Sequence, residues 1–151
     1  MKRLTGILLI VLLVFSLSAA MAQRVECATG GFSVKLPDHF VEESFDHGSG
    51  NDLVFWWHGN KLTVQAYSYY QGEGVDISEL FQVLDSSDED YGLVSINGKK
   101  MYYSRSGGSE ITVSYSWMNR GYNVTMYFTY SASESSVINT VNSIINSIRF
   151  D

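Results

Sequence analysis

The segment from Glu110 to Tyr130 constrains the fold of this chain more than any other. It reads EITVSYSWMNRGYNVTMYFTY, two alternating runs joined at Arg120-Gly121. A two-residue loop there puts eight large side chains on one face: Ile111, Val113, Tyr115, Trp117, Val124, Met126, Phe128 and Tyr130. The other face collects Thr112, Ser114, Ser116, Met118, Asn123, Thr125, Tyr127 and Thr129. This alternation predicts an antiparallel hairpin with one buried and one solvated face, which a one-residue slip would invert.

Two more hairpins extend the sheet. The run LVSINGKKMYYSR turns at Asn97-Gly98, the dipeptide most typical of a two-residue hairpin loop. The run DLVFWWHGNKLTVQAYSYY turns at Gly59-Asn60, where glycine suits the first central position of a type II′ turn. Because the loop length fixes the pairing of the flanking strands, each hairpin predicts which side chains share a face.

The register of the second of these hairpins assigns different roles to two adjacent tryptophans. Trp57 pairs with Leu62 on the apolar face, so we expect it to pack in the core. Trp56 goes to the opposite face, near His58 and Tyr67. A large aromatic side chain among polar neighbours is typical of interfaces and ligand sites, although a single exposed apolar side chain needs no function. Trp56, Tyr67 and His58 therefore form the candidate binding surface.

Helical periodicity occurs at two places. Asp76 caps a short helix, DISELFQVL, over 76–84, and Ser131 with Glu134 forms a capping box for a helix near the end of the chain. The second helix carries an apolar stripe of Val137, Ile138, Val141, Ile144, Ile145 and Ile148. We expect the residues from Val141 onward in this stripe to cover Trp117, Val124, Met126 and Phe128.

A first strand over 31–36 and an extended piece holding Phe40 and Phe45 complete the set of elements. Runs of short strands with two helices predict an α+β fold, a meandering antiparallel β-sheet with two helices packed on one face.

The first 22 residues match a signal peptide. Lys2 and Arg3 precede an apolar run from Ile7 to Phe15, and Ala20-Met21-Ala22 is an A-x-A cleavage sequence. A retained membrane anchor needs about 20 apolar residues, more than this run provides. We expect a bacterial protein that is secreted or periplasmic, with no stable anchor after cleavage. Its mature chain would have a flexible N-terminus over 23–30 and a single domain over 31–151.

The charge and the cysteine content of the chain limit the classes of partner that we expect. The chain has 16 acidic and 10 basic residues, and loss of Lys2 and Arg3 would leave a net charge of −8. This field repels nucleic acids and anionic lipid surfaces, so neither is an expected partner. The single cysteine, Cys27, cannot form an intramolecular disulfide. The residues before it, 24–26, do not suit lipid attachment, so we expect its thiol in a flexible tail.

Three segments occur in an order that resembles the PsbP-like superfamily: FSVKLPDHF, SINGKKMYYSR and VINTVNSIINSIRF. The resemblance covers roughly 31–150. The superfamily includes extrinsic photosystem proteins, a Ran-binding import factor and bacterial secreted proteins of the DcrB type. The resemblance implies an α+β fold and non-enzymatic protein binding, and it transfers no site residue to this chain.

Catalytic, metal and cofactor motifs give no positive signal. His39, His47 and His58 lack the spacing of a metal site, and DSSDED over 85–90 lacks the ligand pattern of a calcium loop. The serines occur without a nucleophile elbow. We therefore expect no metal, no cofactor and no enzymatic activity. The main prediction is a module that binds a protein partner of unknown identity. The alternatives are a small-ligand or glycan binder that uses exposed aromatics, and a hydrolase without a recognisable motif.

Overall fold

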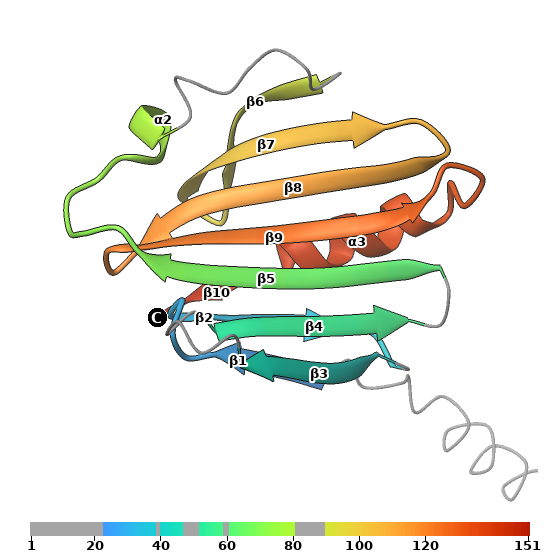
Figure 1. Cartoon of the computed structure of the whole chain (residues 1–151), viewed down its shortest axis with the longest axis horizontal. Helices are drawn as coiled ribbons and strands as arrows, with labels where there is room; N and C mark the ends of the chain where they lie inside the picture. The colour runs from blue at the N-terminus through green and yellow to red at the C-terminus, as the bar shows by residue number, and fades with distance from the viewer. Residues whose placement is uncertain (1–22, 39, 47–51, 59–60, 81–89) are drawn as a thin grey trace, which may run out of the picture.

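The strands of the protein form two antiparallel sheets (Figure 1). The computed structural model describes residues 23–38, 40–46, 52–58, 61–80 and 90–151, and for 41–46 and 52–58 it describes the backbone alone. Within these residues the larger sheet has seven strands, in the order β3 (Val41–Asp46), β4 (Asp52–His58), β5 (Leu62–Tyr70), β9 (Tyr122–Ser131), β8 (Glu110–Asn119), β7 (Lys99–Gly107) and β6 (Asp90–Ile96). The smaller sheet has the order β1 (Gln23–Cys27), β2 (Phe32–Leu36) and β10 (Arg149–Phe150). The predicted antiparallel α+β class is confirmed.

The core lies between the larger sheet on one side and α3 (Val137–Asn146) with the smaller sheet on the other. Figure 1 shows α3 behind β9 and the smaller sheet behind β4. Apolar residues recur along α3 at helical spacing, so one face of the helix meets the sheet. The predicted core is confirmed by residues that are each at most 4% exposed: Trp117, Val124, Met126, Phe128, Val141, Ile144, Ile145 and Ile148.

Two hairpins have the predicted turns and registers. Asn119 pairs with Tyr122 across Arg120-Gly121, and Ile96 pairs with Lys99 across Asn97-Gly98. Both central residues of each turn have positive φ, between 50° and 78°. That geometry is a type I′ turn, whose twist matches the right-handed twist of the flanking strands.

The larger sheet consists of two meanders rather than one. The strands β3 to β5 form the first and β6 to β9 form the second, and the two meet where β5 pairs with β9. After β5 the chain crosses to the far edge of the sheet, so the second meander returns toward β5 (Figure 1). The predicted meander therefore holds within each half, and the pairing of β5 with β9 joins the halves.

The two helices have different positions. Asp76 caps α2 (Ile77–Leu80) as predicted, because the backbone N–H of Ser78 donates to its Oδ1 at 2.8 Å. Asp76 also pairs with Lys100 on β7 at 3.3 Å. Of the two helices in the described part of the chain, α3 alone contributes to the main core, while α2 contacts β7 and β8. Neither described helix is both long and apolar enough to cross a membrane.

The N-terminal segment differs from the predicted flexible tail. Gln23–Cys27 forms β1 and pairs with β2 along its whole length. Val25 and Cys27 are 9% and 7% exposed and join the main core. The alternating apolar residues of this short run thus bury against the rest of the protein, and the cysteine lies inside it.

The start of the C-terminal helix also differs from the prediction. Ser131 ends β9, and α3 begins only at Val137, with Ser136 as an N-cap that makes no side-chain hydrogen bond. Glu134 pairs instead with Lys61 at 3.7 Å. Ile138 lies at the edge of the buried stripe of α3 and is 46% exposed.

Tyr115 gives the fold a testable dependence on alkaline pH. Burial raises its pKa from 10.0 to about 12, and the neighbouring Tyr103 and Tyr130 add to the shift. In the unfolded chain a tyrosine ionises near pH 10, before the native one does. The stability contributed by Tyr115 is therefore complete below pH 10 and is lost as the pH rises through about 12. Urea denaturation over this interval should show a shallower fall in stability for Tyr115→Phe than for wild type. Equal slopes would contradict the burial of the phenol.

Candidate functional site

A groove of about 530 Å³ lies on the face of the larger sheet opposite α3. We call it the tyrosine–threonine groove, and it is lined by Gln65, Tyr67, Tyr69, Thr112, Thr125, Tyr127 and Thr129. These residues alternate along their strands with fully buried ones such as Met126 and Phe128. Since successive side chains of a strand point to opposite faces, the groove and the core are on opposite sides of the sheet.

The pairing of β5 with β9 brings the groove residues together. Gln65 pairs with Tyr127 and Tyr67 with Thr125, while Thr129 pairs with Thr112 of β8. Residues that are opposite in an antiparallel pair have Cβ atoms about 5 Å apart. The lining of the groove is thus fixed by backbone register.

Side-chain contacts hold the groove in shape. The rings of Tyr67 and Tyr127 meet edge to face, with 5.6 Å between centroids and 85° between planes. The Nδ2 of Asn123 donates to the Tyr69 hydroxyl at 3.0 Å. The hydroxyls of Ser116 and Thr125 are hydrogen-bonded at 2.8 Å. A groove built from paired strands and restrained rings is preorganised, so it loses little conformational entropy when a ligand binds.

The described lining of the groove is aromatic, hydroxyl-rich and uncharged. None of its seven lining residues carries a charge, in a chain with 16 acidic and 10 basic residues. Burial raises the pKa of Tyr127, and the neighbouring Tyr67 and Tyr69 add to the effect, so its phenol stays a neutral hydroxyl. Tyr69 is 40% exposed and presents its ring to solvent. Such a surface can pack against apolar groups and exchange neutral hydrogen bonds.

The structure places one of the three predicted site residues in this groove, Tyr67. The side chains of Trp56 and His58 lie outside the described residues. The backbone register of β4 and β5 is one residue away from the predicted one, since Trp56 pairs with Val64 and His58 with Leu62. Three residues, 59–61, lie between the last paired positions, His58 and Leu62, whereas the predicted turn has two residues. Residues 59 and 60 lie outside the described part of the chain.

Sequence reasoning missed most of the groove. The sequence pattern places four of these residues on the solvated face of their hairpin and predicts no function for them: Thr112, Thr125, Tyr127 and Thr129. Their side chains are partly buried. The available signal was the shared lack of charge on two alternating runs, ITVSYSW and YNVTMYFTY, together with TVQAYSYY of β5.

Comparisons with known proteins concern the fold. No family model and no curated protein matches the chain. The solved structure of cyanobacterial PsbP (CyanoP) from Synechocystis superposes with a TM-score of 0.70 at 13% identity, over 89% of this chain and 95% of that one. A Bacteroides thetaiotaomicron protein gives a TM-score of 0.59 at 14% identity, over 87% of this chain but 49% of that one.

A third structure is the Ran-binding protein Mog1p of Saccharomyces cerevisiae. Its TM-score is 0.53 at 9% identity, over 86% of this chain and 96% of that one. At these identities the likeness extends to the fold and not to the site residues. The chain has the PsbP-like fold that its order of elements predicts.

Proposed function

We propose that the protein is an exported interaction module that binds a protein partner through the tyrosine–threonine groove. The observation that carries this proposal is a groove on the central strands whose described lining is uncharged and includes three tyrosines. Tyrosine is enriched at protein interfaces, and charged residues are depleted at interface cores. Tyrosine also supplies a large contact area at low entropic cost, and hydroxyl side chains adapt their hydrogen bonds to the partner.

Two further points support a protein partner and export. Mog1p, which is similar in fold, is named for binding a protein, Ran. The first 22 residues have the three regions of a signal peptide, so the proposed module acts outside the cytoplasm after cleavage near Ala22. The partner is expected to present an apolar or aromatic segment with backbone hydrogen-bonding groups, because the groove offers rings and neutral hydroxyls.

The proposed contact surface is argued from described side chains, so the predicted part played by Trp56 and His58 stays a prediction. Tyr67 stays in the proposal, joined by Tyr69 and Tyr127.

A small neutral ligand such as a glycan is the second candidate. The volume of about 530 Å³ lies within the range of small-molecule sites, about 300–1,000 Å³. Rings and hydroxyls also suit a sugar, whose apolar face can stack on an aromatic side chain.

Two adjacent tyrosines provide a matched test of the groove. Tyr69 lines it and is 40% exposed, whereas Tyr70 is 62% exposed and, by strand alternation, points to the opposite face. We expect Tyr69→Ala to reduce capture of a specific envelope protein by about tenfold or more, the scale of an interface hot spot. Tyr70→Ala should leave capture unchanged. Both variants should retain the wild-type melting temperature within a few degrees.

Quantitative cross-linked pull-down from the native host, followed by mass spectrometry, makes this measurement. Equal capture by Tyr69→Ala and wild type would overturn the proposal. If no protein is captured and an oligosaccharide array shows binding that Tyr69→Ala removes, the glycan candidate replaces the protein partner.

A further inference from the structure

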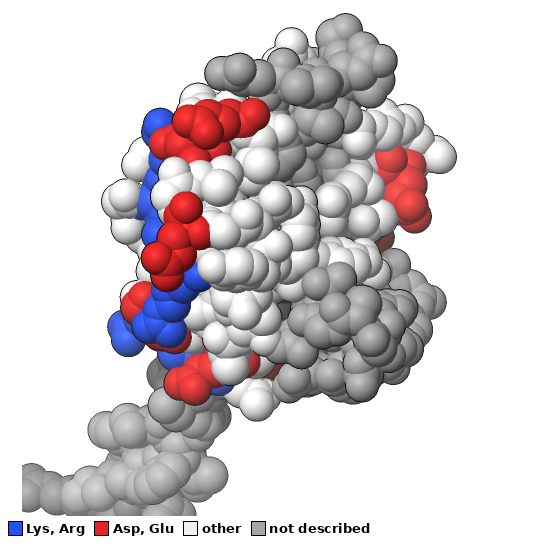
Figure 2. Space-filling model, turned by 60° about the vertical axis from the view of Figure 1, so that its left-hand side comes forward, with Lys and Arg blue, Asp and Glu red and all other residues white. Residues whose placement is uncertain are grey.

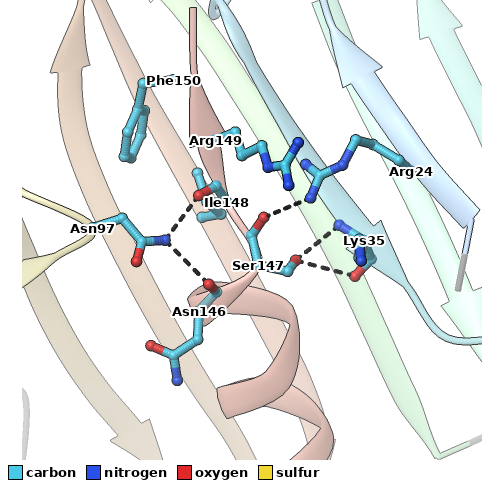
Figure 3. A pocket seen from close by; sticks show the side chains of 8 residues that line it. All are labelled: Arg24, Lys35, Asn97, Asn146, Ser147, Ile148, Arg149 and Phe150. Carbon is cyan, nitrogen blue, oxygen red and sulfur yellow. Dashed lines mark hydrogen bonds between the residues drawn. The ribbon is translucent and has the colours of Figure 1, made fainter.

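A pocket of about 700 Å³ opens on the other side of the molecule, at the C-terminal end of α3 (Figure 3). Its lining includes three basic side chains, Arg24 of β1, Lys35 of β2 and Arg149 of β10. They are three of the eight lysines and arginines that follow Ala22. No acidic residue is among the described residues that line the pocket, although the chain as a whole is acidic. The pocket is therefore a local concentration of positive charge.

The strand register forces these cations onto one face of the smaller sheet. Arg24 pairs directly with Lys35, and Arg149 pairs with Ser33 on the other side of β2. Like charges directly opposite in an antiparallel pair are destabilising. Figure 3 shows Arg24 and Arg149 extended toward one another from opposite edges of the pocket. A structure that tolerates this arrangement gains stability when an anion is placed between the cations.

No carboxylate of the described residues forms an ion pair with Arg24, Lys35 or Arg149. The lysines that do have such partners, Lys61 and Lys100, lie elsewhere. Figure 2 shows lysine and arginine side chains gathered along one edge of that view, with acidic side chains among them. Glu26 is on the same face of the smaller sheet, opposite Ser33, and lies outside the pocket lining.

Some of the side chains that line the pocket cap the C-terminal end of α3. Arg24 donates from Nη2 to the Ser147 carbonyl at 3.2 Å and from Nη1 to the Ser33 hydroxyl at 2.9 Å. Asn97 donates from Nδ2 to the carbonyls of Asn146 and Ile148 at 3.1 and 2.8 Å. These donors satisfy the carbonyl groups that otherwise make a helix C-terminus repel anions.

Arg149 and Lys35 are not needed for capping. Their side chains form no hydrogen bond with the residues that the structure describes, and both residues are exposed. A guanidinium carries five N–H donors, of which Arg24 uses two for protein contacts. The pocket thus keeps charged donors from three strands for a ligand. Arginine pairs of this kind suit oxyanions, which they bind through two parallel hydrogen bonds.

The remaining lining has an apolar part. Ile148 and Phe150 also line the pocket. Phe150 points to the opposite face of β10 from Arg149, with its ring edge-on to Trp117 at 6.0 Å between centroids and Lys99 Nζ 5.0 Å from its own centroid. The volume is within the range of small-molecule sites and far exceeds that of a bare phosphate ion. We propose that this pocket binds a small organic oxyanion, with its phosphate or carboxylate between Arg149, Arg24 and Lys35 and its organic body in the remaining volume. This site is independent of the tyrosine–threonine groove.

Calorimetric titration of the purified protein, expressed from the full-length sequence, tests the site with three probes: phenyl phosphate, phenylacetate and inorganic phosphate. We expect one of the two aromatic probes to bind, the tighter one identifying the oxyanion. Arg149→Gln should weaken that binding by about tenfold or more, because a charged hydrogen-bond donor is lost. Glu26→Gln should strengthen it, since a neighbouring negative charge is removed.

Lys100→Gln is the matched control, because it removes the same charge at a distant ion pair. It should change binding less than about twofold in physiological salt. Arg149 is exposed, so its substitution should leave the melting temperature unchanged and separate binding from folding. Failure of both aromatic probes to bind, or equal binding by Arg149→Gln, would overturn the proposal. Inorganic phosphate binding as tightly as phenyl phosphate would overturn the claim that the pocket takes an organic oxyanion.

Discussion

Phe128→Ala is expected to lower the free energy of unfolding by about 3–5 kcal/mol. Phe128 is 0% exposed at the centre of β9, and its ring packs edge-on against Tyr115 with 6.1 Å between centroids. Its backbone neighbours across the sheet are Val64 and Val113, in the strands on either side. Truncation leaves a cavity that paired strands on both sides cannot close, so the loss includes the cavity as well as the transfer of the ring.

Chemical denaturation of the variant and of Ile138→Ala measures this difference. Ile138 is 46% exposed on α3, and its truncation should cost less than about 1 kcal/mol. A loss of that small size for Phe128→Ala would mean that the buried and exposed faces of β9 are exchanged.

Trp117→Ala should destabilise the protein by a similar amount, about 3–5 kcal/mol, and should loosen the smaller sheet in particular. Trp117 is 0% exposed and connects the two sheets. Its ring meets Phe32 of β2 at 5.1 Å and Phe150 of β10 at 6.0 Å, both edge to face. The smaller sheet has short strands, and this contact contributes to docking it on the larger one.

Trp117→Phe is the matched variant for this contact. The buried Nε1 of Trp117 has no hydrogen-bond partner among the described residues, so phenylalanine loses ring volume without losing a hydrogen bond. We expect Trp117→Phe to lower the free energy of unfolding by less than half as much as Trp117→Ala. Amide exchange should accelerate in β2 more than in β9 for Trp117→Ala. Uniform acceleration across both strands would contradict a specific role in docking the smaller sheet.

The parts of the fold that the sequence predicts correctly depend on local signals. The hairpin of β8 and β9 combines strict alternation with a glycine at the turn, and Asn97-Gly98 fixes the hairpin of β6 and β7. In each case a register slip would expose apolar side chains, so pattern and turn agree on one pairing. The stripe of α3 points to the core for the same reason.

The parts of the fold that the sequence does not predict depend on pairings between segments that are far apart in the chain. β1 was assigned to a flexible tail because its strand partner, β2, and the two-residue β10 form a sheet visible only after folding. The helix start was misplaced because Ser131 and Glu134 have the spacing of a capping box, while Glu134 pairs with Lys61. The register of β4 and β5 shifted by one because three residues, not two, lie between His58 and Leu62.

In the candidate sites too, local sequence predicts some residues, and pairings between distant strands bring in the others. Tyr67 was predicted from its own strand, but Tyr127 and the threonines join it through the pairing of β5 with β9. The basic pocket draws on β1, β2, β10 and the turn at Asn97, which are far apart in the sequence. Scattered basic residues in an acidic chain give no sequence signal of a pocket.

Site-specific photo-cross-linking in the native host tests the central claim most directly, that the tyrosine–threonine groove binds a protein. Thr125→p-benzoylphenylalanine puts a cross-linker in the groove, and Asn142→p-benzoylphenylalanine puts one at an exposed position on α3, across the sheet. We predict a discrete protein adduct from position 125 and none from position 142. An adduct from position 142 alone, or no adduct from either position, would contradict the account.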